Sequence, residues 1–127
     1  MCGISGIISK KPFVAKQLET MNDLINHRGP NDYGHSFWNI NTDQDNKTVV
    51  KKSDSQNYIG LGHRRLSILD LSSRGHQPMC FGNFTIIFNG EIYNYIEIKK
   101  KLMNLGHTFD TQTDTEVLIK SYIQWSE

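Results

Sequence analysis

Cys2 directly follows the initiator methionine, and this position could give the residue a chemical role. Removal of Met1 would leave one residue that carries both a thiol and a free α-amino group. An α-amine titrates at about 7.7–8.0, so a sizeable fraction can accept a proton near neutral pH. A deprotonated thiol is a good nucleophile. Cys2 could therefore supply nucleophile and base together, although a cysteine in a short apolar strand is more often part of the core.

A second candidate is the segment I-I-F-N-G-E-I-Y-N-Y at residues 86–95. If a strand ends in Asn89-Gly90, the Asn89 side-chain amide and the Gly90 backbone N–H lie close together. Two such donors could stabilise a developing oxyanion. The same dipeptide is also the strongest short signal for a type I′ hairpin turn. Taken alone, the pattern favours the turn.

Two further segments carry charged groups that could bind a ligand. The pair Arg64–Arg65 lies in G-H-R-R-L-S-I-L-D, and the guanidinium group of arginine suits a carboxylate. Either arginine in isolation is more often a surface residue. Asp114 in T-Q-T-D-T-E could bind an ammonium group, but capping of a helix explains a carboxylate there equally well.

The sequence gives little support for a metal site or a nucleotide-binding site. His63, His76 and Cys80 are potential metal ligands, but their spacing matches no common zinc pattern, and the chain has no C-x-x-C pair. It has neither a P-loop nor a G-x-G-x-x-G motif. We therefore expect no metal and no cofactor in this chain.

The elements that must position these residues are predicted from hydrophobic periodicity. Short apolar or β-rich runs predict strands over residues 2–8, 37–40, 58–62, 66–71 and 84–88. Helices are predicted over residues 13–26, 95–105 and 114–125. The polar segment 41–57, in which only two valines stand out, is interpreted as a solvated hairpin tip or loop. The pattern as a whole is typical of an α+β fold.

Details of the helices can be predicted as well. In the first helix Val14, Leu18, Met21 and Ile25 recur at the spacing of one buried face. In the second, Ile98, Leu102 and Leu105 share a face. Gly106 follows where a helix C-cap is expected. In the third, Thr113 is the expected N-cap and Glu116 occupies the capping-box position.

Composition excludes several classes of protein. The chain has 127 residues, enough for one domain with a core, and its 37% hydrophobic and 21% charged shares are ordinary for globular proteins. A formal net charge of +1 indicates neither nucleic acid nor an anionic membrane as partner. No segment approaches the ~20 apolar residues of a membrane span, and the N-terminus is unlike a secretory signal. We expect a cytoplasmic protein with reduced thiols.

The motifs gain meaning from their order, because together the chain resembles class II glutamine amidotransferases, a branch of the N-terminal nucleophile hydrolases. It looks most like glutamine-hydrolysing asparagine synthetases, chiefly through the wording N-G-E-I-Y-N. The matching motifs span nearly the whole chain: M-C-G-I-S-G at 1–6, H-R-G-P-N-D at 27–32, R-L-S-I-L-D-L-S at 65–72, G-H-Q-P-M at 75–79, F-N-G-E-I-Y-N-Y at 88–95 and T-D-T-E at 113–116.

The resemblance implies roles for six residues. The thiol of Cys2 would attack the side-chain amide carbon of glutamine, and its freed amine would relay a proton to the leaving ammonia. Asn89 and Gly90 would form the oxyanion hole. Arg65 would hold the α-carboxylate of glutamine, whereas Glu91 and Asp114 would hold its α-ammonium group. No role is implied for Arg64.

The resemblance also implies a fold and a partner. The expected fold has two antiparallel sheets layered between helices (αββα), with residues 1–127 as a glutaminase domain that lacks its last strands. The ammonia would pass to an ATP- and Mg²⁺-dependent synthetase half that makes asparagine from aspartate, and that half is not in this sequence. The chain could be a fragment, a split subunit or a decayed product. Its rival functions are a glutaminase, a glutamine-binding module without turnover, and an amidotransferase for another acceptor.

Overall fold

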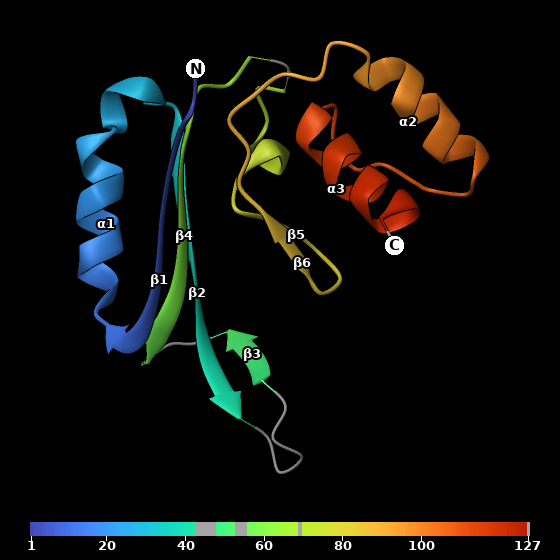
Figure 1. Ribbon diagram of the computed structural model, residues 1–127. Coiled ribbons are helices and arrows are strands. Elements are labelled where there is room, and N and C mark those ends of the chain that lie inside the picture. The colour runs from blue at the N-terminus through green and yellow to red at the C-terminus, as the bar shows by residue number, and fades with distance from the viewer. Residues whose placement is uncertain (43–47, 53–55, 69, 127) are drawn as a thin grey trace.

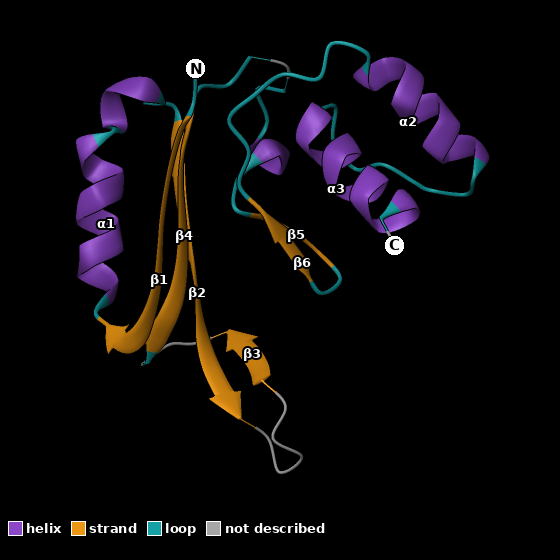
Figure 2. Ribbon diagram, viewed as in Figure 1, coloured by secondary structure: helices purple, strands orange, loops and turns teal. Residues whose placement is uncertain are grey.

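Antiparallel strands β1, β4, β2 and β3 form the larger sheet, in that order across it, in the computed structural model of the chain (Figure 1). The structure describes residues 1–127 except 43–47, 53–55, 69 and 127. The strands span Gly3–Phe13 (β1), Asp32–Thr42 (β2), Thr48–Lys52 (β3) and Asn57–Arg65 (β4). The predicted α+β class is confirmed, with antiparallel sheets and separate helices (Figure 2).

The register of the sheet brings three segments to one end of it. On one side of β4, Gly3 of β1 pairs with Arg64. On the other side, Asp32 of β2 pairs with Arg65. The start of β1, the start of β2 and the end of β4 therefore lie next to one another. Cys2 comes directly before β1, so the register places it beside the arginine pair.

Helix α1 (Ala15–Leu24) covers one face of this sheet (Figure 1). Leu18 is fully buried there, as predicted, but Met21 is 40% exposed and Val14, the N-cap residue, is 66% exposed. Asn22 occupies the buried position instead. Its side-chain amide donates to the backbone oxygen of His63 and contacts Nε2 of His35, which satisfies the buried polar group. The predicted helical face was therefore displaced by one residue at this turn.

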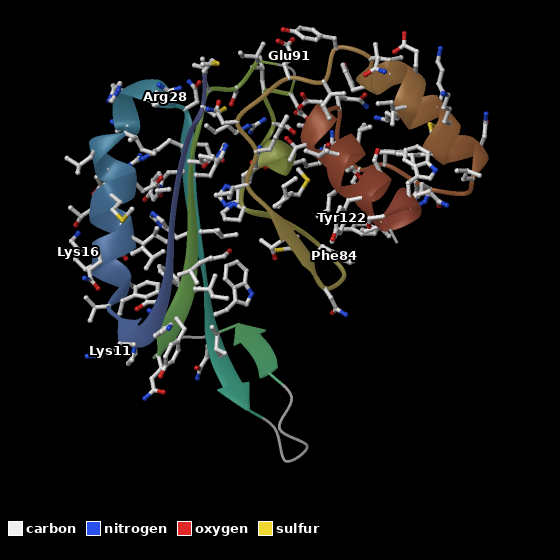
Figure 3. All side chains as sticks on the ribbon, in the orientation of Figure 1. Lys11, Lys16, Arg28, Phe84, Glu91 and Tyr122 are labelled. Atoms are coloured by element: carbon white, nitrogen blue, oxygen red, sulfur yellow. The ribbon has the colours of Figure 1, made fainter. Side chains whose placement is uncertain are left out.

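The opposite face of the sheet is approached by a hairpin and two helices (Figure 1). The hairpin consists of β5 (Met79–Phe81) and β6 (Phe84–Ile86), and the helices are α2 (Tyr95–Asn104) and α3 (Asp114–Trp125). Phe84 and Tyr122 join the hairpin to α3 through an edge-to-face ring contact at 5.5 Å between centroids (Figure 3). Helix, sheet, hairpin and helices thus follow one another as layers.

The predicted ends of α2 and α3 are largely confirmed. Gly106 adopts φ +95°, and the amides of Gly106 and His107 donate back into the last turn of α2. Thr113 caps α3 by accepting the N–H of Glu116. The capping box predicted for Glu116 is wrong. Its carboxylate does not bond the N–H of Thr113 but accepts the N–H groups of Asp110 and Thr111.

Several predicted strands need correction. Residues 66–71 were predicted as a strand, but Leu66 and its described neighbours leave the sheet and form a loop. Side-chain bonds within the loop replace the ladder there, since Asp70 accepts the Ser72 N–H. Strands β3 and β5 were missed: β3 pairs with the end of β2 inside the polar segment, and β5 contains only three residues. Residues 43–47 of that segment lie outside the described residues.

A buried ion pair lies within α3, between Glu116 and Lys120. Lys120 is 1% exposed and donates to the Glu116 carboxylate at 2.6 Å and to the Thr108 oxygen. Burial of Glu116 opposes its ionisation, but hydrogen bonds from Lys120, Asp110 and Thr111 outweigh it, so its pKa lies below the ordinary value. Glu116 therefore fixes the loop that leads into α3.

We predict that Glu116→Gln lowers the free energy of unfolding by about 3–5 kcal/mol, because the ammonium group of Lys120 stays buried without its counter-charge. Urea unfolding followed by circular dichroism measures the loss. The double variant Glu116→Gln with Lys120→Met should be less destabilised than the sum of the two single variants. Simple additivity would show that the two charges do not depend on each other.

Candidate active site

One cavity of about 270 Å³ lies where the end of the main sheet meets the loops before α2 and α3. Its volume is just below the lower end of the roughly 300–1,000 Å³ typical of small-molecule pockets. All six residues predicted from the sequence line it, together with Met1, Leu66, Ile68, Asp70, Gly75, Gln77, Phe88, Tyr93, Thr113 and Thr115; the six are Cys2, Arg65, Asn89, Gly90, Glu91 and Asp114. Tertiary structure thus gathers residues separated by up to 112 positions.

The thiol of Cys2 lies beside the first residue after β4. The Leu66 N–H donates to Cys2 Sγ at 3.3 Å, and the Leu66 oxygen lies 3.7 Å from the same sulfur. Arg28, at the end of the 3₁₀ turn Asn26–Arg28, donates from Nε to the Cys2 backbone oxygen at 3.1 Å (Figure 3). Cys2 is thus held on both its main chain and its side chain.

The guanidinium group of Arg65 is buried and held by backbone carbonyls. Its Nη1 donates to the Ser72 oxygen at 2.8 Å and its Nη2 donates to the Asp70 oxygen. Arg65 is 6% exposed, so the expectation of a surface residue was wrong. Because an arginine carries five N–H donors, these bonds leave others for a ligand in the cavity.

The loop that holds Arg65 is itself held by Asp70. The Asp70 carboxylate accepts the N–H groups of Ser72 at 2.8 Å and of Gln112 at 3.1 Å. Hydrogen bonds from the Ser72 side chain, and then from these two N–H groups, lower the pKa of Asp70 to about 2. Gly75 closes the other side, since a Cβ atom there would lie 2.1 Å from Arg65 Nη2. The guanidinium group thus fits a space that only glycine leaves open.

Asn89 and Gly90 do not form the hairpin turn that their pattern favoured. Strand β6 ends at Ile86, and the chain passes from there toward α2. The turn of the hairpin lies earlier, at Gly82 with φ +56°. Gly90 has a steric reason instead, because a Cβ atom would approach the Phe88 ring to 2.7 Å. The dipeptide therefore lies in an irregular segment at the wall of the cavity.

Glu91 and Asp114, the two carboxylates of the cavity predicted from the sequence, differ in burial. Asp114, the first residue of α3, is 7% exposed, and its Oδ2 accepts the Ile92 N–H at 3.0 Å. Glu91 is exposed and lies at the rim (Figure 3). Asp114 is therefore pre-positioned by the backbone, whereas the Glu91 side chain extends toward solvent.

The other residues that the sequence raised have separate surroundings. Arg64 points to the α1 side, where it bonds Asn22, Asp23 and Asn26, so its position is structural. His63 contacts the Phe88 oxygen, His76 pairs with Asp32 at 2.8 Å, and Cys80 lies 3.5 Å from Thr85. Within the described part of the chain, no group of three potential ligands gathers around a common point.

The sequence did not predict the residues that hold the site in place without lining the cavity. Besides Arg28, Asn31 is one of these: its N–H donates to the Arg65 oxygen at 3.0 Å, and its side chain accepts the Ser67 N–H at 3.1 Å. Both residues belong to the H-R-G-P-N-D motif, which contributed only to the resemblance. The signal was therefore present as a motif, but the part these residues play depends on contacts across 26 to 36 residues of chain that the sequence does not reveal.

Comparisons with known proteins show the family of the chain. The whole chain, residues 1–127, matches the family described as glutamine amidotransferase domain. The chain belongs to this family. Similar proteins include a putative glutamine-hydrolysing asparagine synthetase of Methanocaldococcus jannaschii, 41% identical over 96% of this chain, and asparagine synthetase 1 of Bacillus subtilis, 37% identical over all of it. The resemblance predicted from the motifs is confirmed.

More distant relatives share the domain as well. A glutamine–fructose-6-phosphate aminotransferase of Bartonella quintana is 33% identical over 93% of this chain. The chain spans 24% of the Methanocaldococcus protein, 18% of the Bacillus protein and 21% of the Bartonella protein. Among the described residues, no helix is long and apolar enough to span a membrane.

We predict that acid weakens the fold through His63. This side chain is fully buried and burial lowers its pKa below the ordinary value of about 6.5. Between the ordinary and the lowered pKa, His63 binds a proton in the unfolded chain but not in the folded chain. Stability that is complete above about pH 6.5 is therefore lost as the pH falls toward the lowered pKa.

The measurement compares melting temperatures at about pH 7.5 and about pH 5.5 for the wild type and His63→Gln, which keeps a donor for the Phe88 oxygen. The wild type should lose more on acidification than the variant. The pKa of His35 is also lowered by burial, but that residue is present in both proteins and cancels. Equal losses would contradict a role for His63.

Proposed function

We propose that this chain hydrolyses glutamine to glutamate and ammonia through a thioester on Cys2. The observation that carries the proposal is the cavity in which Cys2, Arg65, Asn89, Gly90, Glu91 and Asp114 meet. Membership of the glutamine amidotransferase family supports glutamine as the substrate. The succession of helix, sheet, hairpin and helices supports a fold of the N-terminal nucleophile hydrolase type, with αββα layers.

Glutamine would bind by its two charged ends. The free donors of Arg65 suit the α-carboxylate, and the negative charge of Asp114 suits the α-ammonium group, with Glu91 adding to it from the rim. Recognition of both ends selects a free amino acid over a glutamine residue within a peptide. Because Arg65 and Asp114 are both buried, each interaction acts in a medium where water screens it less.

The chemistry would proceed in two steps. The Cys2 sulfur forms a bond to the side-chain amide carbon, and the thiol proton passes to the free amine of Cys2. Asn89 and Gly90 donate to the oxyanion that develops. The amine then gives the proton to the leaving nitrogen, the C–N bond breaks, and ammonia departs. Water attacks the thioester, the C–S bond breaks, and glutamate and the free thiol are released.

Removal of Met1 is part of this proposal, since the α-amine of Cys2 exists only after that cleavage. Met1 is 76% exposed and lines the same cavity, so it is accessible to a processing enzyme and its removal would widen the site. We further propose that the ammonia serves an ATP- and Mg²⁺-dependent synthetase partner in the cytoplasm, with asparagine as the product. The asparagine synthetase relatives support that acceptor, and the fructose-6-phosphate relative keeps a different acceptor as the alternative.

The test of the proposed function is covalent labelling combined with turnover. The chain without Met1 should gain one adduct from 6-diazo-5-oxo-norleucine, mapped to Cys2 by mass spectrometry, and should release glutamate from glutamine. Cys2→Ala should lose both while glutamine still protects the chain against thermal unfolding, because the charged ends are bound elsewhere. If the processed chain binds glutamine but neither labels nor turns over, it is a binding module without catalysis.

A second prediction concerns the carboxylate contact. Gly75→Ala should raise KM for glutamine by about tenfold or more, because the new Cβ displaces the Arg65 guanidinium group, and kcat should change less. Gly6→Ala is the matched control, since its Cβ would meet no atom closer than 3.4 Å. Steady-state kinetics of both variants decide the matter. An unchanged KM in Gly75→Ala would remove Arg65 from the carboxylate site.

A further inference from the structure

The backbone just before Asn89 is held at both of its polar atoms. The Phe88 N–H donates to Gln77 Oε1 at 2.7 Å. The Phe88 oxygen lies 3.2 Å from Nε2 of His63, which donates to it in the tautomer that carries the proton on Nε2. The peptide orientation that leads into Asn89-Gly90 is therefore set by two side chains from outside this segment.

Gln77 has a second bond that reaches α3. Its Nε2 donates to Thr115 Oγ1 at 3.1 Å, and both partners are buried. Thr115 directly follows Asp114, which accepts the Ile92 N–H. The segment that contains Asn89 and Gly90 is thus tied to the first turn of α3 on both sides, at Phe88 through Gln77 and at Ile92 through Asp114.

Packing alone does not account for a glutamine at this position. Gln77 is 6% exposed, and a buried amide costs free energy unless its groups are paired. An apolar side chain of the same size would fill the space without that cost, but it would leave the Phe88 N–H without its acceptor. The glutamine side chain links the segment before Asn89 to the first turn of α3, and these two segments carry different parts of the site.

We propose that Gln77 is a positioning residue that holds the oxyanion segment at a set place relative to α3. Through it, the donors of Asn89 and Gly90 keep their aim at the substrate carbon, while Asp114 keeps the α-ammonium group in place. This inference rests on the proposed glutaminase function. Gln77 itself contacts none of the reacting atoms in this scheme, so its loss should affect the rate of the chemical step more than substrate binding.

The experiment uses the processed chain, glutamine as substrate, and variants of similar size. Gln77→Met removes both bonds and should lower kcat by about 10–100-fold, less than the ~10²–10³ for loss of one oxyanion donor, with KM changed by less than about threefold. Gln77→Glu keeps an acceptor for Phe88 and a partner for Thr115, and should recover most of the rate. Gln124→Met makes the same replacement at an exposed glutamine of α3 and should match the wild type.

If Gln77→Met fails to fold, a second pair of variants and a second measurement still test the inference. Thr115→Val breaks only the far bond and should lower kcat by several-fold, and Thr115→Ser should restore it. Amide hydrogen exchange at Phe88, measured by NMR, should be faster in Thr115→Val than in Thr115→Ser.

Loss of kcat with rescue by the conservative variants supports the inference. An unchanged kcat in Gln77→Met or Thr115→Val, or a loss confined to KM, overturns it while leaving the glutaminase function intact. A wild-type chain that binds glutamine but releases no glutamate overturns the proposed function and this inference with it.

Discussion

The antiparallel register between β1 and β4 is the constraint on which the candidate site depends. Because Gly3 lies opposite Arg64, Cys2 comes to lie beside the end of β4, where the Leu66 N–H reaches its sulfur. A slip of one residue would turn every side chain of β1 to the other face and move the thiol out of the cavity. The same strand, β4, also carries Arg65, so one register sets the distance between the proposed nucleophile and the proposed carboxylate contact.

Buried polar side chains order the loops in and around this cavity. Asp70, Gln77 and Glu116 are buried, and each accepts at least one backbone N–H of a loop, from 5 to 42 residues away in sequence. Buried networks of this kind are favourable only when their members are satisfied, and then they specify one geometry. Among the described residues, the buried apolar side chains are Leu18, Leu102, Val117 and Ile119, and they lie outside the cavity. The loops of the site are therefore ordered by hydrogen bonds.

The proposed glutamine site belongs to a domain that also occurs in relatives with different names. The contacts to glutamine proposed here all come from the described residues, and none requires the second substrate. Relatives whose names include asparagine synthetase and fructose-6-phosphate aminotransferase share the domain over nearly all of this chain. A site that recognises only the nitrogen donor can remain constant while the acceptor chemistry differs. For the ammonia transfer proposed above, the residues that line this cavity do not identify the acceptor.

The sequence alone determined the class, the main elements and the six candidate site residues, because these depend on local pattern and on motifs whose order is characteristic. Residue type was enough to propose Cys2 as nucleophile and Arg65 as a carboxylate contact, and the helix ends at Gly106 and Thr113 followed from local preference. Tertiary structure decided the rest. Instead of the strand predicted over residues 66–71, the described residues of that range belong to the loop that holds Arg65, where Ser72 donates its N–H to Asp70 and accepts from Arg65. It also gave Arg28, Asn31 and Gln77 their partners, because a side chain's hydrogen-bonding capacity is set by its type whereas the group it meets is set by the fold.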